Sequence, residues 1–161
     1  MIEVSDSALR DGLVASLAVP RWVTDVASHA PFADLDELLT VARAAATPLS
    51  RVEIEQAVAH HPRIGEAPVG TGLAQDFSRA EQGGAGASSP DLSDELAAGN
   101  AAYERRFGRM FIIRAAGRGR AEILGELHRR SQLEDAVELQ IVGEQLRDIA
   151  LLRLQKLFGT P

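Results

Sequence analysis

The stretch SQLEDAVELQIVGEQLRDIALLRLQKLF, residues 131–158, decides the fold because it predicts one long amphipathic helix. Ser131 and Glu134 fit a capping box, in which each side chain accepts a hydrogen bond from the other residue's backbone N–H, and Gly159 is typical of a helix end. At 1.5 Å per residue this helix is about 40 Å long. Its apolar stripe consists of Leu133, Val137, Ile141, Ile149 and Leu152.

Helical start and stop signals recur along the rest of the chain. Ser50 and Glu53 form a second capping box, and the helix that they open ends at the histidine pair 60–61. The stretch MFIIRAAG, residues 110–117, fits either a strand or a buried extended connector. We therefore predict an all-α, single-domain bundle of about eight helices. The other helices are expected at 6–17, 20–29, 34–46, 90–107 and 118–130, with a weak nucleus at 78–82.

Composition limits the classes of function. The 161 residues fit one domain, and no apolar run approaches the ~20 residues that span a bilayer. The N-terminus lacks the pattern of a signal peptide, so we expect a cytoplasmic protein. There is no cysteine, which excludes disulfides and thiolate chemistry. A net charge of −6 argues against nucleic acid or an anionic membrane as partner.

The basic residues are unevenly distributed. All but one of the 17 are arginines, and eight of these lie within 105–130. Arginine grips carboxylates through a planar fork, so this region could bind a small anion. The alternative is a solvated face that balances nearby acids.

The stretch AHHPRIGE, residues 59–66, places two of the four histidines at a helix end. Pro62 disfavours helical backbone at His61, which should leave the helix and turn toward the following loop. There it could act as an acid or base near neutral pH, while His60 is expected to be structural. The alternative for His61 is a helix-terminal residue favoured by the helix dipole. Adjacent histidines do not form a helical metal pair, so no metal site is expected.

Residues 65–90 are rich in Gly, Ser and Pro and form the longest irregular stretch, where we look for a site. Ser78 and Glu81 fit a capping pattern, which could be their whole role. Alternatively, Glu81 and Gln82 face a pocket as hydrogen-bonding groups. Arg153 lies beside the apolar stripe of the last helix, where an arginine usually keeps its head in water; a buried head would need an anion.

Several of these stretches resemble the family of 2-oxo-4-hydroxy-4-carboxy-5-ureidoimidazoline (OHCU) decarboxylases, which act in urate degradation. The resemblance covers nearly the whole chain. Its most specific segments are HPRIGE at 61–66, SRAEQGG at 78–84, NAAYERRFGRMFII at 100–113 and IALLRL at 149–154, after a looser match over 17–42. The chain departs from the family pattern at Arg109 and Met110, where an aromatic residue and proline are common.

The resemblance implies one all-helical domain over 1–161, usually a homodimer, that forms (S)-allantoin from a small ureidoimidazoline substrate without a cofactor. It implies His61 as base or proton shuttle and Glu81 as its catalytic partner. The substrate contacts that it implies are Pro62, Ser78, Gln82, Arg153 and the backbone at Ile112 and Ile113. The competing hypothesis is a noncatalytic helical module that binds an anion or partner through Arg105–Arg130.

Overall fold

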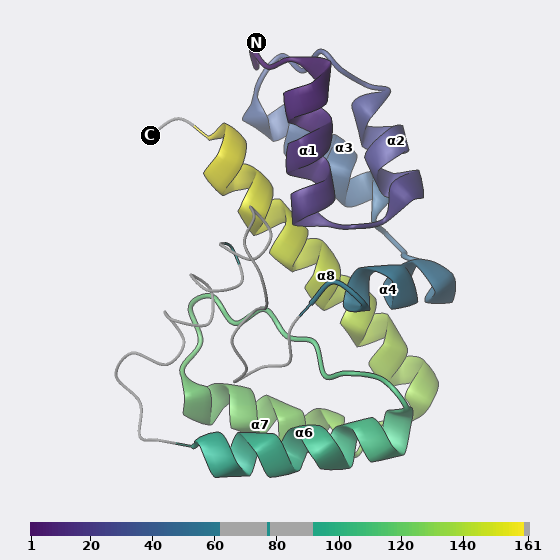
Figure 1. Ribbon diagram of the computed structural model, residues 1–161, viewed down its shortest axis with the longest axis vertical. Coiled ribbons are helices and arrows are strands. Elements are labelled where there is room, and N and C mark those ends of the chain that lie inside the picture. The colour runs from purple at the N-terminus through teal and green to yellow at the C-terminus, as the bar shows by residue number, and fades with distance from the viewer. Residues whose placement is uncertain (62–76, 78–91, 160–161) are drawn as a thin grey trace. The chain divides into compact units, whose positions relative to one another are not determined.

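The computed structural model describes residues 1–61, 77 and 92–159 (Figure 1). Helices account for the regular structure of these residues, and no strand occurs among them, as the sequence predicts. Seven helices lie in the described ranges, compared with about eight predicted, and the weak nucleus at 78–82 lies outside them. The helices are α1 (Asp6–Ser16), α2 (Pro20–Ala27), α3 (Leu35–Ala45), α4 (Arg51–Val58), α6 (Ser93–Phe107), α7 (Arg120–Arg130) and α8 (Asp135–Phe158).

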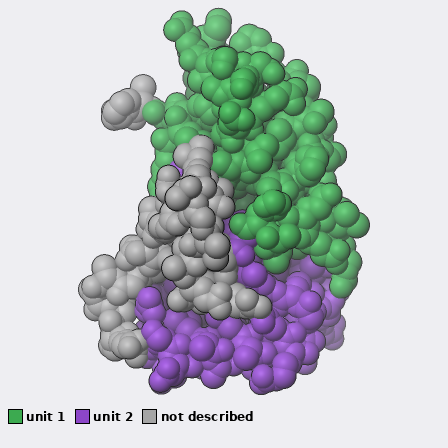
Figure 2. All heavy atoms as spheres, in the orientation of Figure 1, with its two compact units in different colours: residues 1–60, 143–161 green, residues 61–142 purple. Residues whose placement is uncertain are grey.

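The chain divides into two compact units, coloured separately in Figure 2. Unit 1 consists of residues 1–60 and 143–161, and unit 2 of residues 61–142. The first eight residues of α8, 135–142, belong to unit 2, and the rest of the helix belongs to unit 1. The single domain predicted over 1–161 stays a prediction.

Unit 1 forms where local start signals place its helices. Pro20 occupies the first turn of α2, and the Ser5 and Asp34 side chains cap α1 and α3. The capping box before α4 is confirmed: Ser50 N–H donates to Glu53 Oε1 at 2.9 Å, and Glu53 N–H donates to Ser50 Oγ at 3.2 Å. Trp22, fully buried, donates from Nε1 to the Ala42 carbonyl at 3.0 Å and so ties α2 to α3.

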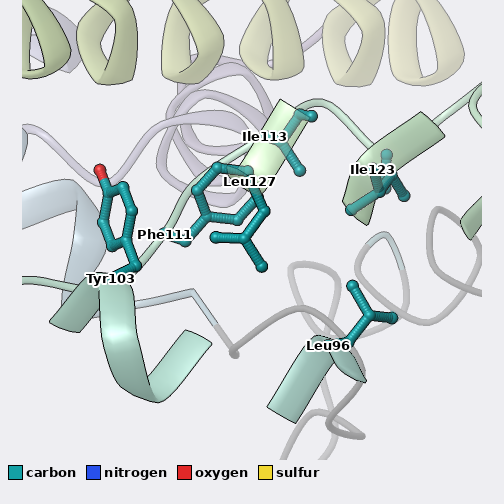
Figure 3. Close-up of a cluster of buried hydrophobic side chains, with 7 residues drawn as sticks. Leu96, Tyr103, Phe111, Ile113, Ile123 and Leu127 are labelled. Carbon is teal, nitrogen blue, oxygen red and sulfur yellow. The ribbon is translucent and has the colours of Figure 1, made fainter. Parts of the chain in front are cut away.

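Unit 2 has its own apolar core, in which α6 packs beside α7 (Figures 1 and 3). Gly108 ends α6 with φ +70°, a left-handed conformation that glycine adopts without strain. The stretch 110–117 then runs as a connector without strand pairing, and its apolar side chains at 111–113 are buried. Of the two alternatives for this stretch, the buried extended connector is therefore the right one. The core cluster consists of Leu96, Tyr103, Phe111, Ile113, Ala115, Ile123 and Leu127.

The predicted start of the last helix is wrong. Ser131 lies after the last turn of α7, where its hydroxyl donates to the Leu127 carbonyl at 2.6 Å, and α8 begins at Asp135. The hydroxyl is therefore bonded to the preceding helix and does not cap the following one. Helix α6 likewise begins at Ser93, later than the predicted start at Pro90, because Leu92 has non-helical dihedral angles.

The buried face of α8 also differs from the predicted stripe. Val137 is 47% exposed and Ile141 is only partly buried, whereas Glu138 has no exposed surface. The face that is buried repeats at helical spacing through Glu138, Val142, Leu146, Ile149, Arg153 and Leu154. Ile149 is the member of the predicted stripe that is buried, and two charged residues, Glu138 and Arg153, occupy core positions that the apolar pattern did not predict.

Candidate functional site

His61 lies just beyond α4, outside the helix, as Pro62 predicts. Ala59 is the C-cap of α4, and the His60 N–H closes one further turn on the Ala57 carbonyl at 3.1 Å. The His60 side chain is exposed, whereas His61 is half-buried. The different burial supports different roles for the two histidines, although the direction of the His61 ring stays a prediction.

Four of the predicted site residues lie outside the described residues: Pro62, Ser78, Glu81 and Gln82. Among the others, His61, Ile112 and Ile113 belong to unit 2, and Arg153 belongs to unit 1. Within the described ranges, no group of three or more His, Asp or Glu side chains is placed to share a metal ion.

Ile112 and Ile113 form the buried centre of the connector between α6 and α7, with 3% and 5% of their surface exposed. The Ile112 carbonyl oxygen accepts a hydrogen bond from Arg130 Nη1 at 2.8 Å. The predicted substrate contact of this segment is made by its backbone, so this bond bears directly on the candidate site.

A buried polar network that sequence reasoning missed lies behind the connector. Arg130, 1% exposed, forms a salt bridge with the fully buried Glu138, which accepts from Arg130 Nη2 and, at 2.9 Å, from Arg130 Nε. Glu138 Oε1 also accepts from the Tyr103 hydroxyl at 2.6 Å. Burial, and then the bond to Glu138, raises the pKa of Tyr103, which therefore stays a neutral donor. Glu138 lies four residues before Val142 and eight before Leu146, on the same helical face, and this spacing was the available sequence signal.

Arg153 is buried in unit 1, with 3% of its surface exposed. Its Nη1 donates to the Ala15 carbonyl at 3.0 Å. The expectation of a guanidinium that keeps its head in water is therefore wrong. The carbonyl supplies one buried acceptor for the cation, so the arginine is held in place within its own unit.

A cavity of about 550 Å³ in unit 1 contains none of the predicted site residues. It is lined by residues 1–4, 33–36, 157 and 158. The predicted site and this cavity are thus separate features of the chain.

Several arginines of the 105–130 region make contacts within unit 2. Arg118 pairs with Glu122 at 2.9 Å and Arg129 with Glu126 at 2.8 Å. Further pairs join Arg109 to Asp135 at 2.8 Å and Arg106 to the Leu133 carbonyl at 2.8 Å. These contacts favour the interpretation of a face that balances its own acids over that of an anion-binding cluster.

Comparison with solved structures places this arrangement in a known class of fold. The chain superposes on a crystal structure of OHCU decarboxylase in the presence of (S)-allantoin with a TM-score of 0.78 and 27% identity, covering 93% of this chain and 99% of that one. A crystal structure of (S)-allantoin synthase, 17% identical, shares the fold with a TM-score of 0.63 and covers 98% of this chain and 52% of that one. The fold is thus the all-helical fold of the OHCU decarboxylase structure.

Sequence comparison then identifies the family. The sequence model of OHCU decarboxylase matches residues 3–155. The OHCU decarboxylase of Mus musculus is 33% identical over 142 residues, which cover 87% of this chain and 80% of the mouse protein. The uric acid degradation bifunctional protein TTL of Arabidopsis thaliana is 39% identical over 108 residues, 65% of this chain but only 33% of that protein. The chain belongs to the OHCU decarboxylase family.

Proposed function

We propose that this chain decarboxylates OHCU to (S)-allantoin without a cofactor, with His61 as the base or proton shuttle. Membership of the OHCU decarboxylase family makes the chain a carboxy-lyase of urate degradation. The observation that carries the assignment is the family match over residues 3–155, which includes the segments that hold His61, Glu81 and Arg153.

The chemistry of the substrate explains why the reaction needs no electron sink from outside. The carboxylate leaves from a carbon next to a ring C=N bond, so the electron pair released with CO2 flows into that bond. The protein supplies orientation, a base for the neighbouring hydroxyl and a proton delivered to one face of the intermediate.

The residue roles follow the family pattern. His61 removes or relays the hydroxyl proton, and its half-buried position beyond α4 suits a group that exchanges protons with a bound substrate. Glu81, with Gln82, holds the N–H groups of the ureido chain or ring. Arg153 binds a substrate oxygen or carboxylate, and the backbone at Ile112 and Ile113 bonds the ring. Ser78 and Pro62 complete the contacts.

We also propose a cytoplasmic homodimer that binds neither nucleic acid nor membrane. No helix in the described residues is long and apolar enough to cross a membrane. The net charge of −6 supports the exclusion of polyanionic partners.

The first experiment generates the substrate in place from urate with uricase and hydroxyisourate hydrolase. Loss of ultraviolet absorbance and the circular dichroism of the product are followed after this protein is added. One-handed allantoin should appear faster than the slow racemic background. Decay at the background rate, with the protein shown to be folded, would refute the activity.

The two histidines provide a matched test of the site. His61→Asn should lower kcat by about 10²–10⁴-fold, the usual contribution of a positioned proton-transfer group. His60→Ala changes the neighbouring exposed histidine and should keep most of the activity. Equal losses in the two variants would contradict this division of roles, and near-normal activity of His61→Asn would remove His61 as base.

A further inference from the structure

The backbone of the connector between α6 and α7 is fixed by a side chain. Residues 110–115 lie in neither helix nor strand, so no ladder of backbone hydrogen bonds sets their position. The Ile112 carbonyl instead accepts from Arg130 Nη1 at 2.8 Å. A peptide group is planar and, when trans, carries its carbonyl oxygen and its N–H on opposite sides. Holding the Ile112 oxygen therefore also sets the direction of the Ile113 N–H.

Arg130 is itself held rigidly. Its Nε donates to both Glu138 oxygens, at 2.9 and 3.1 Å, and its Nη2 donates to Oε1. The guanidinium carbon lies 4.6 Å from the centre of the Phe111 ring. The Tyr103 hydroxyl also donates to Glu138 Oε1, at 2.6 Å. The Tyr103 ring meets the Phe111 ring edge-on, with their centres 5.2 Å apart (Figure 3). A planar fork with an acceptor for each nitrogen has little freedom to move.

Stability alone does not account for this arrangement. Desolvating two charges is costly, and replacing a buried ion pair by apolar residues of similar volume is often neutral or stabilising. The pair here is almost completely buried, with side-chain exposures of 1% and 0%. What an apolar substitute could not provide is the third bond of the guanidinium, the one to Ile112.

We propose that Arg130, fixed by Glu138 and Tyr103, is a positioning residue that aims the Ile113 N–H at the substrate ring. This inference rests on the proposed function, because it takes the Ile112 and Ile113 backbone to be a substrate contact. Arg130 does not touch the substrate. It acts through the peptide group whose carbonyl it holds, and so affects how the ring is oriented when the proton arrives.

The central test is the triple variant Tyr103→Phe, Arg130→Met and Glu138→Leu, which removes both charges and the hydroxyl and leaves only the Ile112 carbonyl without its donor. Unfolding by urea and far-ultraviolet circular dichroism should show a folded protein. Its kcat/KM should fall by about 10- to 100-fold, the scale expected when a reacting group is misplaced by about 1 Å. The allantoin that it forms should also lose handedness, while the pH profile, which reports His61, should not shift.

Arg129→Gln is the matched control. Arg129 is the neighbour of Arg130 on α7 and forms a surface ion pair with Glu126. It should keep wild-type kcat/KM and handedness. A folded triple variant with wild-type values of both would overturn the proposal, since a merely structural network predicts that result.

Two further measurements keep the outcomes distinct. Arg130→Lys keeps a cation beside Glu138 but loses the fork, and should lose activity even if the triple variant does not fold. If neither variant folds, the network serves stability and the proposal fails. Backbone amide exchange at 111–115 should be faster in the triple variant than in the control. If the wild-type protein shows no decarboxylation, the proposed function is refuted. Faster amide exchange at 111–115 in the triple variant would still support the anchoring role of Arg130.

Discussion

Removing one member of the buried ion pair should destabilise unit 2 strongly. In Arg130→Met the Glu138 carboxylate, which has no exposed surface, loses both the Nε and Nη2 donors. Breaking a buried pair in this way costs about 3–5 kcal/mol, because an uncompensated charge stays in the interior. At about 2–4 °C per kcal/mol for a chain of this size, Tm should fall by about 6–20 °C.

The measurement is urea unfolding of four proteins followed by circular dichroism: wild type, Arg130→Met, Glu138→Leu in a Tyr103→Phe background, and the triple variant. The triple variant should lose less stability than Arg130→Met, about 1–3 kcal/mol relative to wild type, because both charges and the orphaned hydroxyl are gone and only the buried Ile112 carbonyl has lost its donor. The cycle isolates the coupling between Arg130 and the Glu138–Tyr103 pair. A free energy of unfolding for Arg130→Met within about 1 kcal/mol of wild type would refute the burial argument.

Three further predictions concern stability. The pKa of Glu53 is lowered to about 2, chiefly by the Arg21 hydrogen bond at 2.6 Å, so Glu53 stabilises the fold above pH ~4.5 and this contribution is lost as pH falls toward 2. Because the Arg21 side chain is exposed, this contribution to the free energy of unfolding is about 1 kcal/mol. The variant Glu53→Gln should therefore show a weaker dependence of the urea midpoint on pH between 5 and 3. An unchanged pH dependence would contradict the role of the Arg21–Glu53 pair. Gly99→Ala places a Cβ 2.5 Å from Leu127 Cδ2 in the core. The overpacking should cost about 1–3 kcal/mol and outweigh the gain in helix propensity of about 1 kcal/mol, so Tm should fall. A higher Tm would show that Leu127 moves aside freely. Asp34→Ala removes the acceptor for the Glu37 N–H at 2.8 Å and should lower the urea-derived free energy of unfolding by about 1 kcal/mol, whereas no change would mean that water replaces the cap.

Much of the helical pattern could be predicted because its signals are local. The box at Ser50 and Glu53, the proline at the start of α2 and the glycine after α6 each act within about one helical turn. The same limit explains the error at Ser131. A serine three residues before a glutamate can cap the following helix or bond back to the preceding one, and the local pattern is equally compatible with both.

The sequence by itself determined the all-helical class, the placement of His61 beyond its helix and the family, since each depends on residues close together in the chain or on ordered motifs. Only the tertiary structure decided which face of α8 is buried, that Glu138 pairs with Arg130, and that this arginine holds the connector at Ile112. The physical reason is that burial is set by segments that meet from distant parts of the chain. The local sequence around Glu138 does not specify that Arg130 will be its buried partner.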